Sequence, residues 1–286
     1  MGVLLGLATA FAWGSADFLA RFASRTIGAL RIAFYLQFFG FLFLTAILLR
    51  LHAWGHLFDH SGWQPWAWGA LVGVFNALAM FALYRAFELG KLSVVGPLSS
   101  SYPALTLVLS FFAGERLTVI RIIGIALALL GALAVARGET SPESVSTRDG
   151  KGIVWAVAAA VLFGFMFWLL GTRVIPTTGA YATVWLMRGT AALVTLAILV
   201  ARNQALGLPG KKTAAQAAGT GLLDTGAFVL SNVSMQMEQV SVITVLASLY
   251  GAVTVLLAAI FLRERVSLTQ WLGIIAIFAG IFLISR

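Results

Sequence analysis

Four polar side chains interrupt long apolar stretches of this sequence, namely Asp17, Asn76, Arg188 and Asp224. A charge inside a lipid bilayer costs at least about 2.5–3.5 kcal/mol, so such residues usually face a cavity or a partner. We predict a central substrate site in which Arg188 holds a carboxylate, while Asp17 and Asp224 are candidates for binding an ammonium group or for carrying a proton. Arg188 and Asp224 lie at similar depth, so the alternative is a buried ion pair that only fixes helix packing.

The composition shows why these stretches are assigned to a membrane. Hydrophobic residues make up 60% of the 286 residues and charged residues 10%, whereas soluble domains have about 45–50% and about 25%. The absence of cysteine excludes disulfides, metal–thiolate sites and cysteine nucleophiles. The net charge of +9 comes from Lys and Arg beside apolar segments, a pattern typical of membrane anchoring rather than of nucleic-acid binding. We expect a multi-pass protein of a bacterial plasma (inner) membrane.

The apolar stretches are long enough to cross a bilayer, which takes about 20 residues. The predicted spans are 3–23, 29–49, 66–88, 92–113, 118–136, 152–171, 180–201, 214–236, 240–262 and 267–284. The predicted fold is therefore an all-α membrane protein with ten transmembrane helices.

The two halves of the chain repeat one another. A polar linker at 138–151 separates residues 1–137 from residues 152–286, and each half holds five predicted spans. The repeat is strong in the last two spans of each half, with the pairs Tyr102/Tyr250, Thr106/Thr254, Glu115/Glu264, Gly124/Gly273 and Gly131/Gly280. The third and eighth spans then align Asn76 with Asp224, and the weaker match of the first and sixth spans aligns Gly14 with Gly164. Because five is odd, the second half must enter the membrane from the opposite side. We predict two inverted five-helix repeats, which is typical of secondary transporters with a site near the midplane.

The predicted fourth and ninth spans contribute further candidates for the substrate site. Tyr102 and Tyr250 occupy matching positions, and Pro103 should kink the fourth helix and free carbonyl groups. Ser99 is predicted either to contact the ligand or to allow close packing of helices.

Small and aromatic residues mark other predicted contacts. Gly14 and Gly164 should allow close helix approach, and the seven-residue spacing from Gly124 to Gly131 and from Gly273 to Gly280 is typical of a helix–helix seam. The aromatics near Gly164, including Trp168, line a substrate wall in one interpretation and contact lipid in the other.

Several charged residues are assigned to the membrane surface. The two Glu-Arg pairs, at 115–116 and 264–265, should lie in structural turns on opposite faces, with Thr118 and Ser267 as helix N-caps. Arg85 and Glu88 should form an i,i+3 ion pair. His52, His56 and His60 would share one face if their segment were helical, as a zinc site or as interfacial side chains.

The motifs WGSADF (13–18), LSSSYPALTLVLSFFAGERLT (98–118) and LASLYGAVTVLLAAIFLRERVS (246–267), with the duplication, resemble the EamA branch of the drug/metabolite transporter superfamily. The resemblance covers nearly the whole chain. It implies alternating access around a cavity between the repeats, export of amino acids, other metabolites or drugs, and frequent proton exchange. It also implies cytoplasmic termini, whereas the positive-inside rule applied to the links places both termini outside the cytoplasm.

The function predicted from these features is secondary active transport of a small polar or amphipathic metabolite, most simply as an exporter. A structural or receptor protein of the membrane and a facilitative uniporter without ion coupling remain alternatives. A membrane enzyme and a channel have no supporting motif in the spans. We expect a small-molecule substrate, protons and the lipid bilayer as partners, no nucleic acid, no cofactor and no metal, in a monomer or homodimer.

Overall fold

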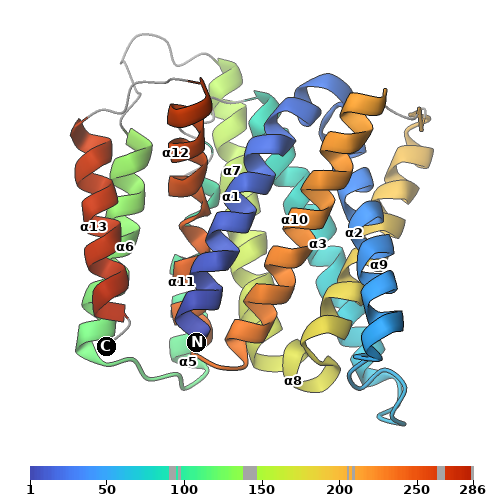
Figure 1. The fold of residues 1–286 in the computed structure, drawn as a ribbon, viewed down its shortest axis with the longest axis horizontal. Helices are drawn as coiled ribbons and strands as arrows, with labels where there is room; N and C mark the ends of the chain where they lie inside the picture. The colour runs from blue at the N-terminus through green and yellow to red at the C-terminus, as the bar shows by residue number, and fades with distance from the viewer. Residues whose placement is uncertain are drawn as a thin grey trace.

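Helices lying side by side make up the fold (Figure 1). The computed structural model describes residues 1–89, 95, 98–137, 147–204, 206–207, 210–262 and 268–284, and these residues contain no strand. The helices are α1 (Gly2–Ile27), α2 (Ala29–Leu51), α3 (Gln64–Leu89), α5 (Pro103–Phe112), α6 (Val119–Arg137), α7 (Thr147–Leu169), the π-helix η1 (Leu170–Val174), α8 (Ile175–Thr178), α9 (Ala180–Ala201), α10 (Lys211–Met235), α11 (Val240–Ser248), α12 (Tyr250–Leu262) and α13 (Leu268–Ile284).

Five segments within the described residues are long and apolar enough to cross a membrane. They are Gly2–Ser24, Ala29–Leu51, Gln64–Leu89, Gly150–Thr178 and Ala180–Ala201. Shorter apolar helices occupy Pro103–Phe112, Val119–Gly131, Val240–Thr254 and Trp271–Ile284. The predicted class of all-α, multi-pass membrane protein is thus confirmed. The predicted span 214–236 is also helical, as α10, although its many small and polar residues make it less apolar than the five.

Two predicted spans are interrupted at matching places. α5 begins at Pro103 after a turn at 100–102, so the predicted kink is a break in the helix. α11 ends at Ser248 and α12 begins at Tyr250, an interruption that the sequence analysis did not anticipate. Tyr102 and Tyr250 therefore stand next to interruptions of their helices.

Single glycines make the tight turns between two further pairs of helices. Gly28 joins α1 to α2 with φ 86° and ψ 155°, and Gly179 joins α8 to α9 with φ 90° and ψ 149°. This backbone region is essentially restricted to glycine, because a Cβ atom would clash there. The two glycines occupy equivalent places in the two halves of the chain.

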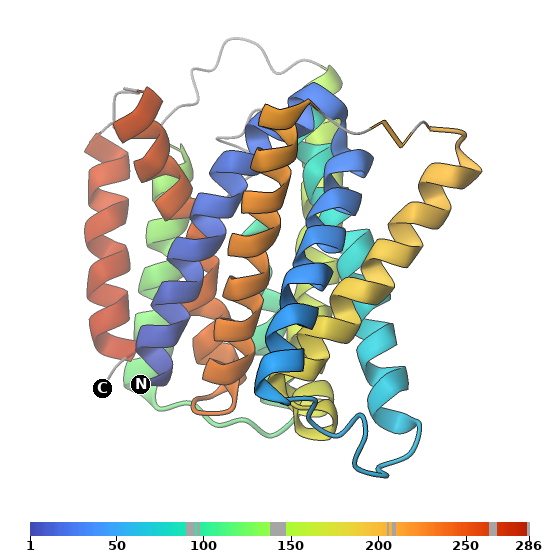
Figure 2. The same ribbon diagram turned by 45° about the vertical axis from the view of Figure 1, so that its right-hand side comes forward.

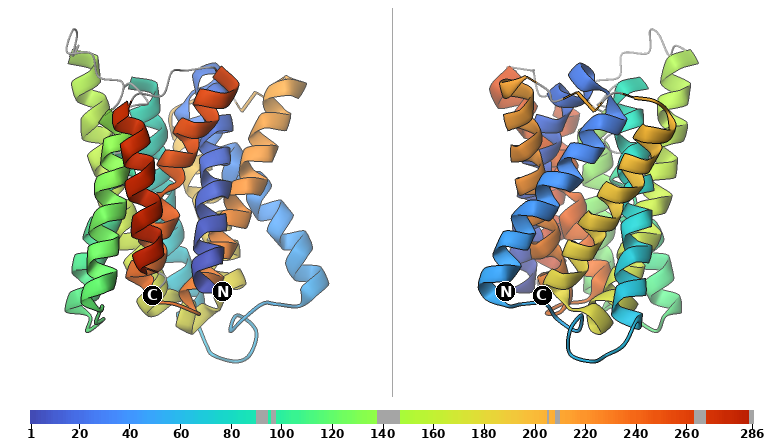
Figure 3. Two further views of the ribbon diagram at one scale, coloured as in Figure 1. Left: turned by 60° about the vertical axis from the view of Figure 1, so that its left-hand side comes forward. Right: turned by 90° about the vertical axis from the view of Figure 1, so that its right-hand side faces the viewer.

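The helix contacts fall into reciprocal pairs. In the repeat, α1 corresponds to α7, α2 to α9, α3 to α10 and α5 to α12. The α1–α10 contact therefore matches the α3–α7 contact, the α2–α10 contact matches α3–α9, and the α1–α12 contact matches α5–α7. α2 with α9 and α6 with α13 are contacts between corresponding helices of the halves, and α5 with α11 joins the predicted fourth and ninth spans. α6 and α13 lie together at one edge of the molecule (Figure 3).

The α6–α13 contact is built on the predicted glycine seam. A Cβ atom on Gly124 would lie 2.8 Å from the carbonyl oxygen of Gly280, and one on Gly131 would lie 2.6 Å from that of Gly273. The glycines therefore permit backbone-to-backbone approach. The contact is antiparallel and reciprocal, because the first glycine of each helix meets the second glycine of the other.

The predicted close approach at Gly14 and Gly164 is also present, in matching form. Gly14 packs on α12, where the hydroxyl of Thr254 lies 3.3 Å from the Gly14 carbonyl oxygen. Gly164 packs on α5, where the Thr106 hydroxyl donates to the Gly164 carbonyl at 3.1 Å. Equivalent residues thus make equivalent hydrogen bonds in the two halves.

The links between helices give a mixed result. Arg85 and Glu88 form the predicted ion pair at 2.6 Å, and Thr118 precedes α6 with its hydroxyl 3.4 Å from the Arg121 amide nitrogen. Glu115 accepts a hydrogen bond from the Ser241 hydroxyl at 3.0 Å, so the first Glu-Arg turn contacts the start of α11. The second Glu-Arg pair, Ser267 and most of the 138–151 linker lie outside the described residues.

The histidine segment is not helical, which corrects the premise that its three histidines share one face. His52 and His60 have positive φ angles of 53° and 70°, and glycines at 55 and 62 interrupt the segment further. His56 instead pairs with Asp59 at 2.5 Å. Among the described residues, no group of three His, Cys, Asp or Glu is placed to hold a metal ion.

Candidate functional site

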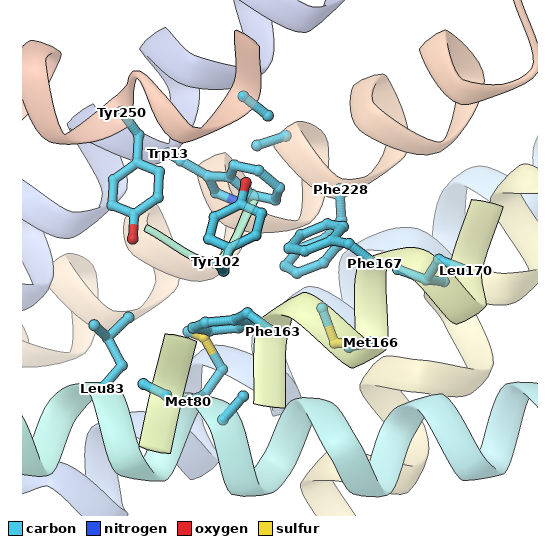
Figure 4. Packing of buried hydrophobic residues seen from close by; sticks show 14 of the residues in the cluster. Trp13, Met80, Leu83, Tyr102, Phe163, Met166, Phe167, Leu170, Phe228 and Tyr250 are labelled. Atoms are coloured by element: carbon cyan, nitrogen blue, oxygen red, sulfur yellow. The ribbon is translucent and has the colours of Figure 1, made fainter. Parts of the chain in front are cut away.

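A cavity at the centre of the bundle is lined almost entirely by aromatic and apolar side chains (Figure 4). They come from α1, α3, the turn before α5, α7, α10 and α12. The lining residues are Trp13, Asp17, Met80, Leu83, Tyr102, Phe163, Phe167, Asp224, Phe228 and Tyr250. Four of the eight predicted site residues are among them, namely Asp17, Tyr102, Asp224 and Tyr250.

The aromatic rings form a continuous stack along one wall of the cavity. Phe167 stacks on Tyr102 with ring centroids 4.9 Å apart and on Phe228 with centroids 5.8 Å apart. Trp13 meets Phe228 edge-on at 4.9 Å. Such a wall suits a flat apolar group, and its ring faces attract cations.

A buried polar network lies beside the cavity and uses three of the four polar residues predicted from depth. Arg188, on α9, donates to Asp224 at 2.5 Å and to the Gln37 side-chain oxygen at 2.7 Å. The Gln37 amide donates to Asn76 at 2.6 Å. The predicted pairing of Arg188 with Asp224 is confirmed, and it is embedded in a network that joins α2, α3, α9 and α10.

Arg188 has little capacity left for a ligand. Its side chain is fully buried, and its guanidinium carbon lies 4.8 Å from the centroid of the Phe228 ring. Both terminal nitrogens are bonded to Gln37 and Asp224. Only its Nε remains without a hydrogen-bond partner in the described part of the chain. Phe228, a member of the aromatic wall, lines the cavity, whereas Arg188 does not.

Asp17 differs from Asp224 in its surroundings. It is half-buried on α1 and lines the cavity directly. None of the ion pairs formed by described side chains includes Asp17, and no described side chain donates a hydrogen bond to it. Its strongest interaction with a charged group is with the carboxylate of Asp224. Asp17 is thus a carboxyl group in an aromatic cavity with no cationic partner among the described side chains.

The two tyrosines lie close to the ends of their interrupted helices. The Tyr102 hydroxyl lies 3.3 Å from the carbonyl oxygen of Thr244 on α11. Tyr250 interacts through its hydroxyl with the side chain of Ser99, which is itself fully buried. Ser99 therefore reaches the site through Tyr250, and the interruptions in both halves are in contact with the cavity.

Trp168 is not brought to the cavity. It is half-buried, and its indole nitrogen has no hydrogen-bond partner among the described residues. Phe163 and Phe167, on the same helix, take the inward positions instead, as Figure 4 shows. The prediction of an aromatic wall near Gly164 thus holds for neighbouring residues rather than for Trp168.

Gln37 was not among the predicted site residues, although it is a polar residue in an apolar predicted span like those that were. Gln37 is a fully buried amide in an otherwise apolar predicted span, and it links Arg188 to Asn76. Met80, Leu83 and Phe228 were also missed, because nothing distinguishes them in sequence from apolar residues that face lipid.

The cavity is small in this conformation. Its volume is about 30 Å³, which corresponds to about two water molecules. A metabolite therefore needs side chains or helices to move before it can bind. A second, larger cavity of about 630 Å³ lies among the ends of α1, α2, α3, α9 and the start of α7.

Together, the apolar helices define a polytopic helical membrane protein with a small cavity at its centre. Comparison with known proteins shows which class this is. The chain belongs to the EamA-like transporter family, whose model matches residues 1–137 and 150–286. The family assignment confirms the resemblance inferred from the motifs, and it makes the protein a membrane transporter.

Two known proteins are similar to the chain, one in sequence and one in fold. An uncharacterized transporter, YxxF of Bacillus subtilis (strain 168), is 30% identical over 213 residues, which is 74% of this chain and 67% of that protein. A solved structure named only as the crystal structure of a protein matches with a TM-score of 0.78 and 16% identity, over 99% of this chain and 95% of that one. At that identity the second match demonstrates a shared fold and nothing more.

Proposed function

We propose that the protein is a secondary active transporter built from two inverted five-helix repeats, 1–137 and 152–286, that exchanges a small amphipathic amine for a proton at Asp17. The repeats are joined by the 138–151 linker. The direction that we infer is export, from a bacterial inner membrane. The observation that carries the proposal is a carboxyl group in an aromatic cavity, with no counter-charge among the side chains that the structure describes.

Reciprocal contacts support the inverted repeat. The hydrogen bonds from Thr106 to Gly164 and between Thr254 and Gly14 connect equivalent residues in opposite order along the chain. The α6–α13 glycine seam pairs in the same crossed way. Such reciprocity is what a two-fold relation between two halves produces. The two ends of the chain lie at the same face (Figure 2), as an even number of crossings requires.

The cavity favours a substrate with an apolar or aromatic body and a positive group. Aromatic faces attract ammonium groups by about 0.5–2 kcal/mol, and a desolvated carboxylate attracts them further. Amines and amino acids have an ammonium group that Asp17 could hold between Trp13 and Tyr250. Because Arg188 is bonded to Asp224 and Gln37, we assign it to positioning Asp224 rather than to holding a substrate carboxylate.

The same carboxyl group accounts for coupling. Asp17 binds either a proton or the ammonium group of the substrate, so release of one favours binding of the other. Asp224, the other proton-coupling candidate, is less suited because Arg188 neutralises it. Alternating access then requires the cavity of about 30 Å³ to open toward one face at a time. The interrupted helices at Tyr102 and Tyr250 provide matching places where the repeats can bend.

Binding of three ligands with the same ring tests the substrate class on purified protein. Phenethylamine carries an ammonium group, 2-phenylethanol no charge, and phenylacetate a carboxylate. We expect phenethylamine to bind at least about tenfold more tightly than 2-phenylethanol, which corresponds to one charge-assisted contact, and Asp17→Asn to remove this preference. Asp59→Asn, in an exposed link, is the matched control. Tightest binding of phenylacetate, lost in Arg188→Gln, would instead identify Arg188 as the ligand-binding charge.

A further inference from the structure

The larger cavity, at the face where α1 turns into α2, is rich in arginine. It has a volume of about 630 Å³ and is bordered by the Gly28 turn, the ends of α3 and α9 and the start of α7. Three guanidinium groups line it, those of Arg31, Arg85 and Arg202. The Phe81 and Trp155 rings meet edge-on at 5.6 Å and form an apolar part of its wall.

Only one of these arginines is neutralised within the described residues. Arg85 pairs with Glu88 at 2.6 Å, and the second oxygen of Glu88 accepts the Ala29 backbone N–H at 2.5 Å. Arg31 and Arg202 form no ion pair with any described side chain. Among the described side chains the wall therefore carries an excess of two positive charges, one from α2 and one from the residue that follows α9.

The segment after α9 is held in place beside α2. The Tyr35 hydroxyl, one helical turn beyond Arg31, donates to the Gly207 carbonyl at 2.8 Å. The Gln204 backbone N–H donates to the Leu199 backbone carbonyl at 3.0 Å, which fixes the end of α9. Gln204 lines the cavity as well and adds an uncharged amide to the two guanidinium groups. These bonds keep the two arginines on the walls of one cavity.

We propose that this cavity binds a phosphate group between Arg31 and Arg202. Guanidinium groups donate paired hydrogen bonds to phosphate oxygens, and two of them can neutralise a phosphate without removing Glu88 from Arg85. The volume of about 630 Å³ accommodates a glycerophosphate group, with the Phe81–Trp155 pair beside its apolar part. The phosphate belongs either to an anionic phospholipid headgroup at the membrane surface or to a free phosphate ester. This site is separate from the central cavity and does not depend on amine transport.

Native mass spectrometry of the purified protein tests this site with two phosphate-bearing probes. Dioctanoyl phosphatidylglycerol represents the lipid, sn-glycerol 3-phosphate represents the free ester, and dioctanoylglycerol is the phosphate-free control. The variants are Arg31→Gln with Arg202→Gln, Arg202→Gln alone, and Arg50→Gln as the matched control. Arg50 is an exposed arginine at the opposite end of α2. Arg202 is also exposed, so we expect its single substitution to test the site without destabilising the fold.

We expect binding of at least one phosphate probe, weaker by about tenfold or more in Arg202→Gln and absent in the double variant, with Arg50→Gln unchanged. Binding of the phosphatidylglycerol alone assigns the site to a lipid, and binding of both probes assigns it to the phosphate ester in general. Binding of neither probe would overturn the proposal. Equal binding by Arg202→Gln and the parent protein, or equal binding of dioctanoylglycerol, would overturn it too.

Discussion

Asp224→Asn is the substitution that best separates a structural from a substrate-binding role for Arg188. It keeps the shape of the side chain and one hydrogen-bond acceptor, but removes the charge that neutralises a fully buried guanidinium 2.5 Å away. Removing one member of a buried ion pair costs about 3–5 kcal/mol, because the remaining charge is left without compensation. We therefore expect the free energy of unfolding to fall by that amount. At about 2 °C per kcal/mol for a chain of this size, Tm falls by about 6–10 °C.

Thermal unfolding of the purified protein in detergent, followed by circular dichroism, measures this loss. The matched control is Asp59→Asn, where the aspartate is exposed and a Tm shift of less than about 1 °C is expected. The double variant Arg188→Met with Asp224→Leu removes both charges and should recover all but about 1–2 kcal/mol, the cost of leaving Gln37 without its donor. A Tm for Asp224→Asn within about 1 °C of the parent protein would refute the assignment of Arg188 to packing.

Three further predictions concern other parts of the structure. Gly131→Leu should push α6 from α13 and cost about 1–3 kcal/mol by chemical denaturation. Gly219→Leu, where an added Cβ atom meets no atom within 4 Å, should cost less; equal stabilities would disprove the seam. Phe167→Ala should weaken phenethylamine binding by about 3–10-fold, since Phe167 stacks between Tyr102 and Phe228; an unaltered Kd contradicts this. Hydrogen bonding by Ser61, with the His56 contact, lowers the pKa of Asp59 to about 2. Asp59→Asn should therefore increase pepsin cleavage of this link at pH 4 and increase it less at pH 2, where about half of the parent carboxyl groups are protonated; equal cleavage at pH 4 would count against that contact.

The sequence was sufficient to predict the features that depend on polarity or on missing side chains. Arg188 and Asp224 stand out because charge is costly in lipid, and the depth argument correctly paired them. Gly124 and Gly131 stand out because glycines seven residues apart are typical of a close helix–helix contact. The structure has this contact between α6 and α13. The reciprocal arrangement followed from the internal repeat, which needs no knowledge of packing.

The orientation of apolar side chains could not be predicted, because lipid and protein core are equally apolar. Phe163, Phe165, Phe167 and Trp168 were interpreted together as a wall, and Trp168 was selected for the site, but it is Phe163 and Phe167 that line the cavity. A soluble helix marks its inner face by hydrophobic periodicity, and a transmembrane helix largely lacks this signal. Gln37 is different, because its polarity can be recognised in the sequence. Its role as the link between Arg188 and Asn76 could not be predicted, because it depends on how α2, α3 and α9 pack together.

Exchange of an organic cation for protons at Asp17 is the central claim, and flux into liposomes tests it most directly. Phenyltrimethylammonium is a suitable probe, because it has no uncharged form that crosses the bilayer unaided. Liposomes containing the protein and an acidic interior should accumulate it as protons leave, Asp59→Asn should match the parent, and Asp17→Asn should fall to the level of empty liposomes. Accumulation by Asp17→Asn at the parent rate, or parent flux indifferent to the pH gradient, would contradict the account.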